Sequence, residues 1–352
     1  MESFRPDLIS PALTYLQRPA VANIFEIAGR FILFELNGVE LRGFAEALSE
    51  YYCTPVRPGV SQAPDATIRF QTENSPFDVT GFERFEISGG GVGYTEGRTC
   101  VFDFEHACVL VHPGKTHQID LLMRRDLDFQ RFDDLQVLNY AISTALRRCD
   151  VYELHSGAVV EPQTKRGVLF VGASGSGKST LTLQLVANGW GFLTDDVLCL
   201  KESRGNVQAS PLRRVFAVTR STVEASGSRA REAFANADWS DGSKKAFMPH
   251  EVFPEAFSPH GKPHSIFFPT ITDEDQSVVK ALTPGDTMIH LIKLCPWSCY
   301  DPVTSTRHLN VLSSLAKQCN GFKLLAGTDL LRDPARASEL VLEHANSATQ
   351  TF

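Results

Sequence analysis

The stretch GASGSGKST, residues 172–180, constrains the fold of this chain more than any other part of its sequence. The apolar run VLFV, residues 168–171, comes directly before it, and the helix-forming run KSTLTLQLVAN, residues 178–188, follows. The pattern G-x-x-x-x-G-K-[ST] is met in full by Gly172, Gly177, Lys178 and Ser179. A strand, this loop and a helix in succession are typical of a phosphate-binding unit, so we expect a nucleotide here.

Each part of this loop has a physical task. The glycines let successive peptide N–H groups turn inward, and the positive end of the following helix dipole faces the same anion. We expect Lys178 to reach the outer phosphates and Ser179 to ligate Mg²⁺. The residues expected to hold the nucleotide are Gly172, Ala173, Ser174, Gly175, Ser176, Gly177, Lys178, Ser179 and Thr180.

Two adjacent carboxylates follow the loop after one helix and one turn. Gly189 is expected to end the helix in a left-handed conformation, and we place the run WGFLTDDVLCL in one strand beside the phosphate strand. Phosphoryl transfer needs a magnesium ion on the phosphates and a base for the acceptor proton. We expect Asp195 and Asp196 to divide these tasks, with Asp196 favoured as the base. Neither a signature like LSGGQ nor an apolar run ending in Asp-Glu is present, which argues against a transporter ATPase.

The segment 154–200, LHSGAVV…GVLFVGASGSGKSTLTLQLVANGWGFLTDDVLCL, resembles the nucleotide-binding core of bacterial HPr serine kinase and its relatives, which share a fold with phosphoenolpyruvate carboxykinase. The resemblance implies that His155 joins Lys178, Asp195 and Asp196 in the catalytic constellation, with Ser179 and the two aspartates at the metal. From the residues alone, a core histidine on a strand is the stronger interpretation of His155. The resemblance also implies a homo-oligomer.

The same family carries two further segments, of the form V-x-P-G-R-N and E-x-R-G, and we find neither in this chain. The resemblance therefore favours an HPr kinase-related protein over HPr kinase itself. It leaves the identity of the phosphoryl acceptor open.

The periodicity of apolar residues divides the chain into two expected domains. Residues 1–132 alternate with period two, which indicates a strand-rich domain with one helix at 41–52 and a hairpin turn at GGGVG, residues 89–93. Residues 133–352 form the expected nucleotide-binding kinase domain, of α/β class with α+β elements, which begins with a helix at 135–148 capped by Asp134. The polar segment 221–245 is expected to be a loop or lid.

A positive side chain is expected to clamp the phosphates. The candidates are Arg213, Arg214, Lys244 and Lys245, and a solvated charge is the alternative for each of them. Lys245 is the first choice because a flexible acidic and Gly-Ser stretch precedes it.

Composition excludes several classes of partner. The formal net charge is −7 and no run of Lys and Arg forms a basic stripe, so a nucleic-acid partner is not expected. No apolar run is long enough to span a membrane and no secretory signal is visible at the start, so we expect a cytoplasmic protein with free thiols at its eight dispersed cysteines.

These observations predict a Mg²⁺-ATP-dependent kinase that transfers the γ-phosphate to a hydroxyl of a protein, a peptide or a small molecule. The alternative is a nucleotide-gated binding protein or slow NTPase without an acceptor. A carboxykinase is less favoured because no second anion-binding cluster is recognisable in the sequence.

Overall fold

The chain divides into two compact units, each with its own large sheet. The computed structural model describes residues 23–37, 39, 41–51, 53–56, 63–87, 90–237, 239 and 244–347. The first unit comprises Met1–Tyr152 and Trp297–His308, and the second comprises Glu153–Pro296 and Leu309–Phe352. The first unit therefore extends past the expected boundary at 132/133 and takes a short later segment as well. Among the described residues, no helix combines the length and the apolar character needed to cross a membrane.

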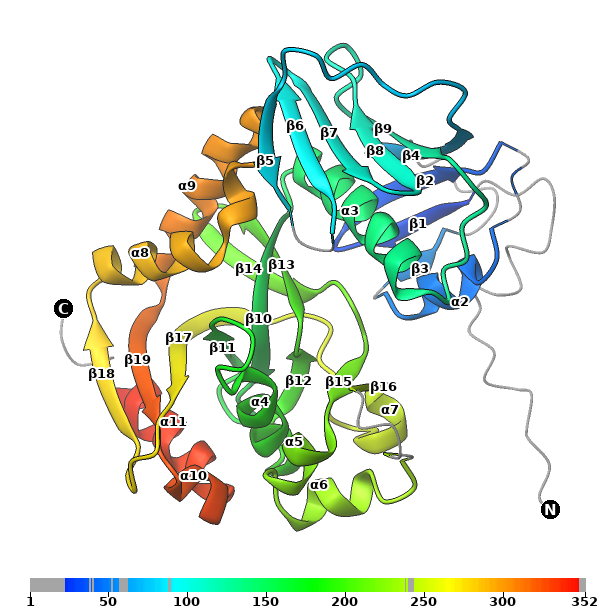
Figure 1. Ribbon diagram of the computed structural model, residues 1–352. Helices are drawn as coiled ribbons and strands as arrows, with labels where there is room; N and C mark the ends of the chain where they lie inside the picture. Colours follow the sequence, from blue (N-terminus) through cyan, green and yellow to red (C-terminus); the bar gives the residue numbers. More distant parts are fainter. Residues whose placement is uncertain are drawn as a thin grey trace, which may run out of the picture. The chain divides into compact units, whose positions relative to one another are not determined.

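The first unit is built on a nine-stranded sheet in the order β3-β1-β2-β4-β9-β8-β7-β6-β5 (Figure 1). Its period-two sequence runs form strands as expected, and β5 and β6 pair antiparallel on either side of the glycine run. Gly89 of the predicted hairpin turn lies outside the described residues. The strands are β1 Ile24–Ile27, β2 Arg30–Glu35, β3 Cys53–Pro55, β4 Ala66–Thr72, β5 Glu83–Glu86, β6 Val92–Glu96, β7 Thr99–Phe104, β8 Ala107–Val111 and β9 Gln118–Met123.

Two helices accompany this sheet, α2 Phe44–Ser49 and α3 Phe132–Arg148. The predicted N-cap of α3 is wrong, because Arg131 caps the helix and Asp134 lies inside its first turn. Asp134 is fully buried and accepts hydrogen bonds from the guanidinium of Arg125 at 2.9 and 2.6 Å. The pairing with Arg125 compensates for the cost of burying this carboxylate in the first turn of the helix.

The second unit is a mixed α/β structure around an eight-stranded sheet. The strand order is β14-β13-β10-β11-β17-β19-β18, with β12 paired to β10. Strand β11 pairs antiparallel with β10 and parallel with β17, and β17 pairs parallel with β19. The strands are β10 Tyr152–Val160, β11 Arg166–Val171, β12 Gly191–Thr194, β13 Val197–Ser203, β14 Asn206–Pro211, β17 Lys262–Ile271, β18 Val278–Leu282 and β19 Asn320–Ala326. A separate two-stranded sheet joins β15 Phe216–Val218 to β16 Lys245–Phe247.

Helix α4 follows the helical run predicted after the glycine loop, whereas α5 and α6 lie in the segment that was expected to be a loop. Gly189 follows the last turn of α4 with a φ of +90°, the left-handed conformation expected there. The helices are α4 Lys178–Ala187, α5 Arg220–Glu224, α6 Ser228–Ala233, α7 Pro249–Val252, α8 Pro284–Leu294, η2 Pro296–Cys299, α9 Pro302–Gln318, α10 Asp329–Arg332 and α11 Ala335–Ser347. Residues Trp297–His308, which form most of η2 and the first part of α9, belong to the first unit, and the rest of α9 belongs to the second.

Two expectations about the second unit are wrong in detail. The run WGFLTDDVLCL is not one strand, because β12 ends at Thr194, β13 begins at Val197, and the two aspartates form the break. The segment 221–245 is not a continuous loop, since α5 and α6 fold within it; residues 238 and 240–243 lie outside the described residues. Apolar contacts explain the second difference, because Val223, Ala230 and Phe234 are buried in the core of this unit.

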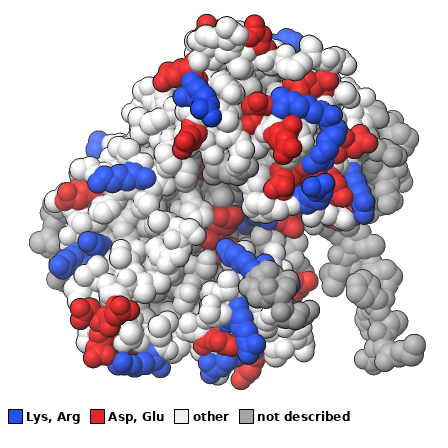
Figure 2. Space-filling model, in the orientation of Figure 1, with Lys and Arg blue, Asp and Glu red and all other residues white. Residues whose placement is uncertain are grey.

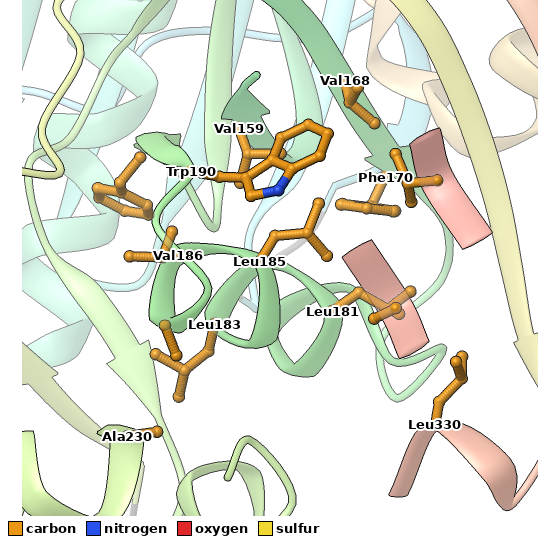
Figure 3. Close-up of a cluster of buried hydrophobic side chains, with 14 of the residues drawn as sticks. Val159, Val168, Phe170, Leu181, Leu183, Leu185, Val186, Trp190, Ala230 and Leu330 are labelled. Atoms are coloured by element: carbon orange, nitrogen blue, oxygen red, sulfur yellow. The ribbon is translucent and has the colours of Figure 1, made fainter. Parts of the chain in front are cut away.

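Helix α4 anchors that core against the sheet. Figure 3 shows Leu185 on the side of the helix that faces Phe170, while Leu183 lies on the opposite side, toward Ala230; Leu181 belongs to the same core. All these side chains are almost fully buried. Burial of both flanks of α4 fixes the helix on the sheet, and with it the loop that precedes the helix.

Candidate functional site

The two sequence motifs of the second unit meet at one edge of its sheet. Strand β11, which leads into the glycine loop, and strand β12, which leads into the aspartate pair, both run antiparallel to β10. Their carboxyl ends therefore lie at the same edge. Strand β12 is one strand further from β11 than expected, because β10 lies between them. The carboxyl ends of both strands flank the first half of β10, where His155 stands beside Ser156, the register partner of Val171.

The glycine loop has the backbone conformation that an anion site requires. Gly175 and Gly177 have φ angles of +79° and +97°, which disfavour any residue with a side chain. Gly177 caps α4 without a side-chain hydrogen bond, so the peptide N–H groups of the first helical turn remain available to an anion. Helix α4 lies so close to β10 that a Cβ atom on Gly157 would come within 2.3 Å of the Thr182 hydroxyl oxygen.

Lys178 is the first residue of α4 and is almost fully buried. Its ammonium donates hydrogen bonds to the carbonyl oxygens of Gly172 at 2.7 Å and Ala173 at 3.0 Å. Burial lowers the pKa of Lys178, and the charge of Asp196 opposes that effect. To bind phosphate oxygens as expected, the ammonium must give up its hydrogen bonds to these two carbonyl oxygens and donate to the phosphate oxygens instead. Ser179 and Thr180 are half-buried behind it.

Asp195 is the buried member of the aspartate pair, only 2% exposed. One carboxylate oxygen accepts a hydrogen bond from the Ala217 peptide N–H at 2.9 Å, while the other is buried without a hydrogen-bond partner. Burial, together with the neighbouring charge of Asp196, raises the pKa of Asp195 to about 7. An oxygen left without a partner in such a place is where a cation or proton is favoured.

Asp196 is the accessible member, with a side chain that is 34% exposed. Its carboxylate lies 3.2 Å from Nδ1 of His155 and 3.7 Å from the Arg213 guanidinium. Burial acts to raise the pKa of Asp196, but the hydrogen bond with His155 and the charge of Arg213 outweigh it, so this pKa lies below its ordinary value. His155 is thus a partner of Asp196 at the site edge and is 37% exposed, unlike a core histidine.

Arg213 and Lys244, both candidate clamp residues, act on these carboxylates. Arg213 pairs with Asp196, and the positive charge of Lys244 lowers the pKa of Asp195, Asp196 and Lys178. Lys245, the first choice from sequence, lies in β16 and is half-buried. The face of the molecule in view intersperses both signs of charge (Figure 2).

The other side of the loop borders a pocket of about 460 Å³ that the sequence did not suggest. Loop residues 172–176 form one wall, and the end of β17, the middle of β19 and α8 form the rest. The larger side chains of this lining include Phe268, Ile271, His290, Lys293 and Lys323. They come from three elements far apart in the sequence, so no local motif could have indicated them.

Comparison with known proteins gives little beyond this geometry. No family model matches the chain, and no curated protein matches it. Among solved structures, it is similar to the Hpr(Ser) kinase/phosphatase from Coxiella burnetii, with 16% identity over 54% of this chain and 98% of that chain, at a TM-score of 0.30. A TM-score this low establishes neither a shared fold nor a shared activity.

Proposed function

We propose that this chain is a Mg²⁺-ATP-dependent kinase that transfers the γ-phosphate of ATP to a hydroxyl group. One observation carries the proposal: the loop with Lys178 and the Asp195–Asp196 pair lie at one edge of the same sheet, with His155 between them in β10. A phosphate cradle with a lysine and adjacent carboxylates is the set of groups that phosphoryl transfer to a hydroxyl requires. The acceptor is a serine of a protein or peptide, or a small molecule.

The residues at the site fit a magnesium ion. Mg²⁺ prefers oxygen ligands and takes only one or two carboxylates, since substrate phosphates and water fill its other positions. Among the described residues, no group of three or more His, Cys, Asp or Glu side chains could hold a metal alone. Asp195 offers a buried oxygen without a hydrogen-bond partner, and Ser179 lies in the first turn of the helix that follows the loop. These two residues would hold the ion, which supplies charge neutralisation on the phosphates.

The other residues act on the phosphates and on the acceptor. The loop N–H groups hold the phosphate chain, and Lys178 stabilises the charge that develops on the migrating group. Asp196 is accessible and ionised, so it can take the proton of the acceptor hydroxyl. His155 and Arg213 orient its two oxygens. In this assignment the buried aspartate holds the metal and the accessible one is the base.

The test uses γ-labelled ATP and Mg²⁺ with a cell extract fractionated into proteins and small molecules. Wild type is expected to move label into a discrete species. Replacing Lys178 by Ala removes the group that stabilises transition-state charge and is expected to slow transfer by about 10²–10³-fold. Lys317→Ala, an exposed lysine on α9, is the matched control and should leave transfer unchanged.

Nucleotide binding by wild type with no transfer to any fraction would contradict the kinase and favour the nucleotide-gated switch. Release of free phosphate at equal rates by wild type and Lys178→Ala would contradict both. Sorting the labelled species into protein or small molecule identifies the class of acceptor.

A further inference from the structure

The pocket between the glycine loop and α8 has the construction of a binding site. Its volume of about 460 Å³ lies within the range of about 300–1,000 Å³ typical of ligand pockets. Exposed loop residues Ala173, Ser174 and Gly175 form one wall, so a ligand held by the loop through its phosphates extends into this space.

Topology separates this pocket from the aspartates. Strand β11, which carries the loop, has β10 on one side and β17 followed by β19 on the other. His155 and the aspartate pair lie on the β10 side, and the pocket is lined from β17, β19 and α8. A nucleotide in the loop therefore has its transferable end toward β10 and its other end toward β17. The opposite order would place the γ-phosphate away from Asp196.

Two stacked aromatic rings form part of the pocket wall. The ring of His290 in α8 stacks on the buried Phe268 of β17, with centroids 4.8 Å apart and an interplanar angle of 27°. This contact holds a half-buried imidazole flat at the pocket wall. A flat ring held in this way is a stacking surface for a planar heterocycle.

Positive charge gathers at the same place. Lys323 of β19 is the register partner of Phe268 and also of Lys280 in β18, so the three side chains lie in one row on one face of the sheet. Like charges directly opposite each other destabilise a sheet. Lys293 adds another ammonium from α8, and the residues that line this pocket include no carboxylate. The pocket suits an uncharged ring joined to an anion.

We propose that this pocket binds the nucleoside part of ATP, with His290 stacking on the base and Lys293 and Lys323 contacting the α-phosphate and the ring acceptors. The inference rests on the proposed function, since it assigns the loop to the phosphates of the same molecule. The inference adds binding residues that no motif of the chain indicates. It also orients the nucleotide across the sheet, with the γ-phosphate toward β10 and the nucleoside toward β17.

The experiment compares the dissociation constants of ATP and of inorganic triphosphate, measured by calorimetry with Mg²⁺. Replacing His290 by Ala removes the stacking surface and is expected to weaken ATP binding by about tenfold while leaving triphosphate binding unchanged. His290→Phe retains a flat ring and should restore ATP binding. His260→Ala, an exposed histidine after α7, is the matched control and should change neither ligand. Thermal unfolding of each variant checks its folding.

Each result has one meaning. Equal affinity of wild type and His290→Ala for ATP, in a protein that binds both ligands, overturns the nucleoside pocket and leaves the kinase proposal intact. Equal weakening of ATP and triphosphate also overturns it, because the pocket would then bind only anions. A wild type that binds neither ligand overturns the proposed function, and the pocket assignment with it.

Discussion

The two sides of the glycine loop are built in different ways. On the β10 side, most groups come from residues 155–196, one continuous run with a single helix inside it; Arg213, Ala217 and Lys244 follow later in the chain. On the β17 side, Phe268, His290 and Lys323 come from three elements spread over the last third of the chain. The chemistry proposed here is local in sequence, whereas the pocket proposed for the nucleoside is assembled only by the sheet topology.

The two sides also differ in how their charges are satisfied. Asp196 has His155 and Arg213 as partners, and Asp195 accepts from a peptide N–H. Across the loop, Lys280 and Lys323 face each other on adjacent strands and both are exposed. Like charges therefore meet on both sides, two carboxylates on the β10 side and two ammonium groups on the β17 side, and a cation would relieve the first repulsion as an anionic ligand would relieve the second.

The largest expected effect tests the chemical side. Replacing Asp196 by Asn removes the proposed base while keeping the size of the side chain. Phosphoryl transfer is expected to fall by about 10²–10⁴-fold, the usual contribution of a positioned base, and the affinity for ATP should stay the same. Single-turnover transfer of label and calorimetric binding measure the two. Full turnover in Asp196→Asn would refute the role of Asp196 as the base. Loss of both phosphoryl transfer and ATP affinity would mean that the β10 side also binds the nucleotide, so the two sides would not have separate tasks.

A second prediction concerns the stability of the same side. Because the pKa of Asp195 is about 7 in the folded protein and 3.8 ordinarily, the folded state keeps a proton that the unfolded state has lost. This contribution to stability is present below pH 4 and is lost as pH rises toward 7. Asp195→Asn cannot titrate and still accepts from Ala217. The stability of the variant relative to wild type should therefore rise between pH 5 and pH 8.

Urea unfolding at the two pH values measures this change in relative stability. A pKa that differs by one between the folded and unfolded states corresponds to about 1.4 kcal/mol, so the gap between variant and wild type should widen by more than about 1 kcal/mol. Asp273→Asn, an exposed residue between β17 and β18, serves as the control and should show no widening. A gap that stays constant or narrows toward pH 8 would mean that Asp195 is ionised throughout.

The smallest effect sharpens the comparison from the pocket side. Lys280→Glu turns the like-charged pair with Lys323 into an opposite pair, which should stabilise the fold by about 0.2–1 kcal/mol. The same change places a carboxylate beside the pocket and should weaken ATP binding slightly, with Lys280→Gln intermediate. Thermal unfolding and calorimetry measure the two effects. Tighter ATP binding in Lys280→Glu would contradict the anionic ligand.

Local periodicity predicted most elements of both units, because the residues that decide a strand or helix are near one another. The loop, α4 and the left-handed Gly189 could be placed from sequence for that reason. The break of the strand at Asp195 and Asp196 could not, since apolar residues on both sides continue the strand pattern. Strand β12 pairs with one part of β10, and β13 follows after the break and lies between β10 and β14, so the division depends on pairing with distant strands.

The clamp residues show the same limit. Lys245 was the first choice on the flexibility of its neighbours, and its role as a clamp stays a prediction; it pairs with Val218 in β16, while the charge of Lys244 lowers the pKa of both carboxyl groups. His290, Lys293 and Lys323 were not recognised at all, because a stacked pair and a row across strands leave no trace in sequence spacing.

Gly157 carries no functional group, and its absent side chain nevertheless sets a dimension of the site. Because a Cβ there would collide with Thr182, the spacing of β10 and α4 depends on that glycine. His155 and Lys178 lie on these two elements, close to the point of contact. A genetic selection for loss of activity would therefore recover substitutions of Gly157. Second-site replacement of Thr182 by a residue with a smaller side chain would suppress them.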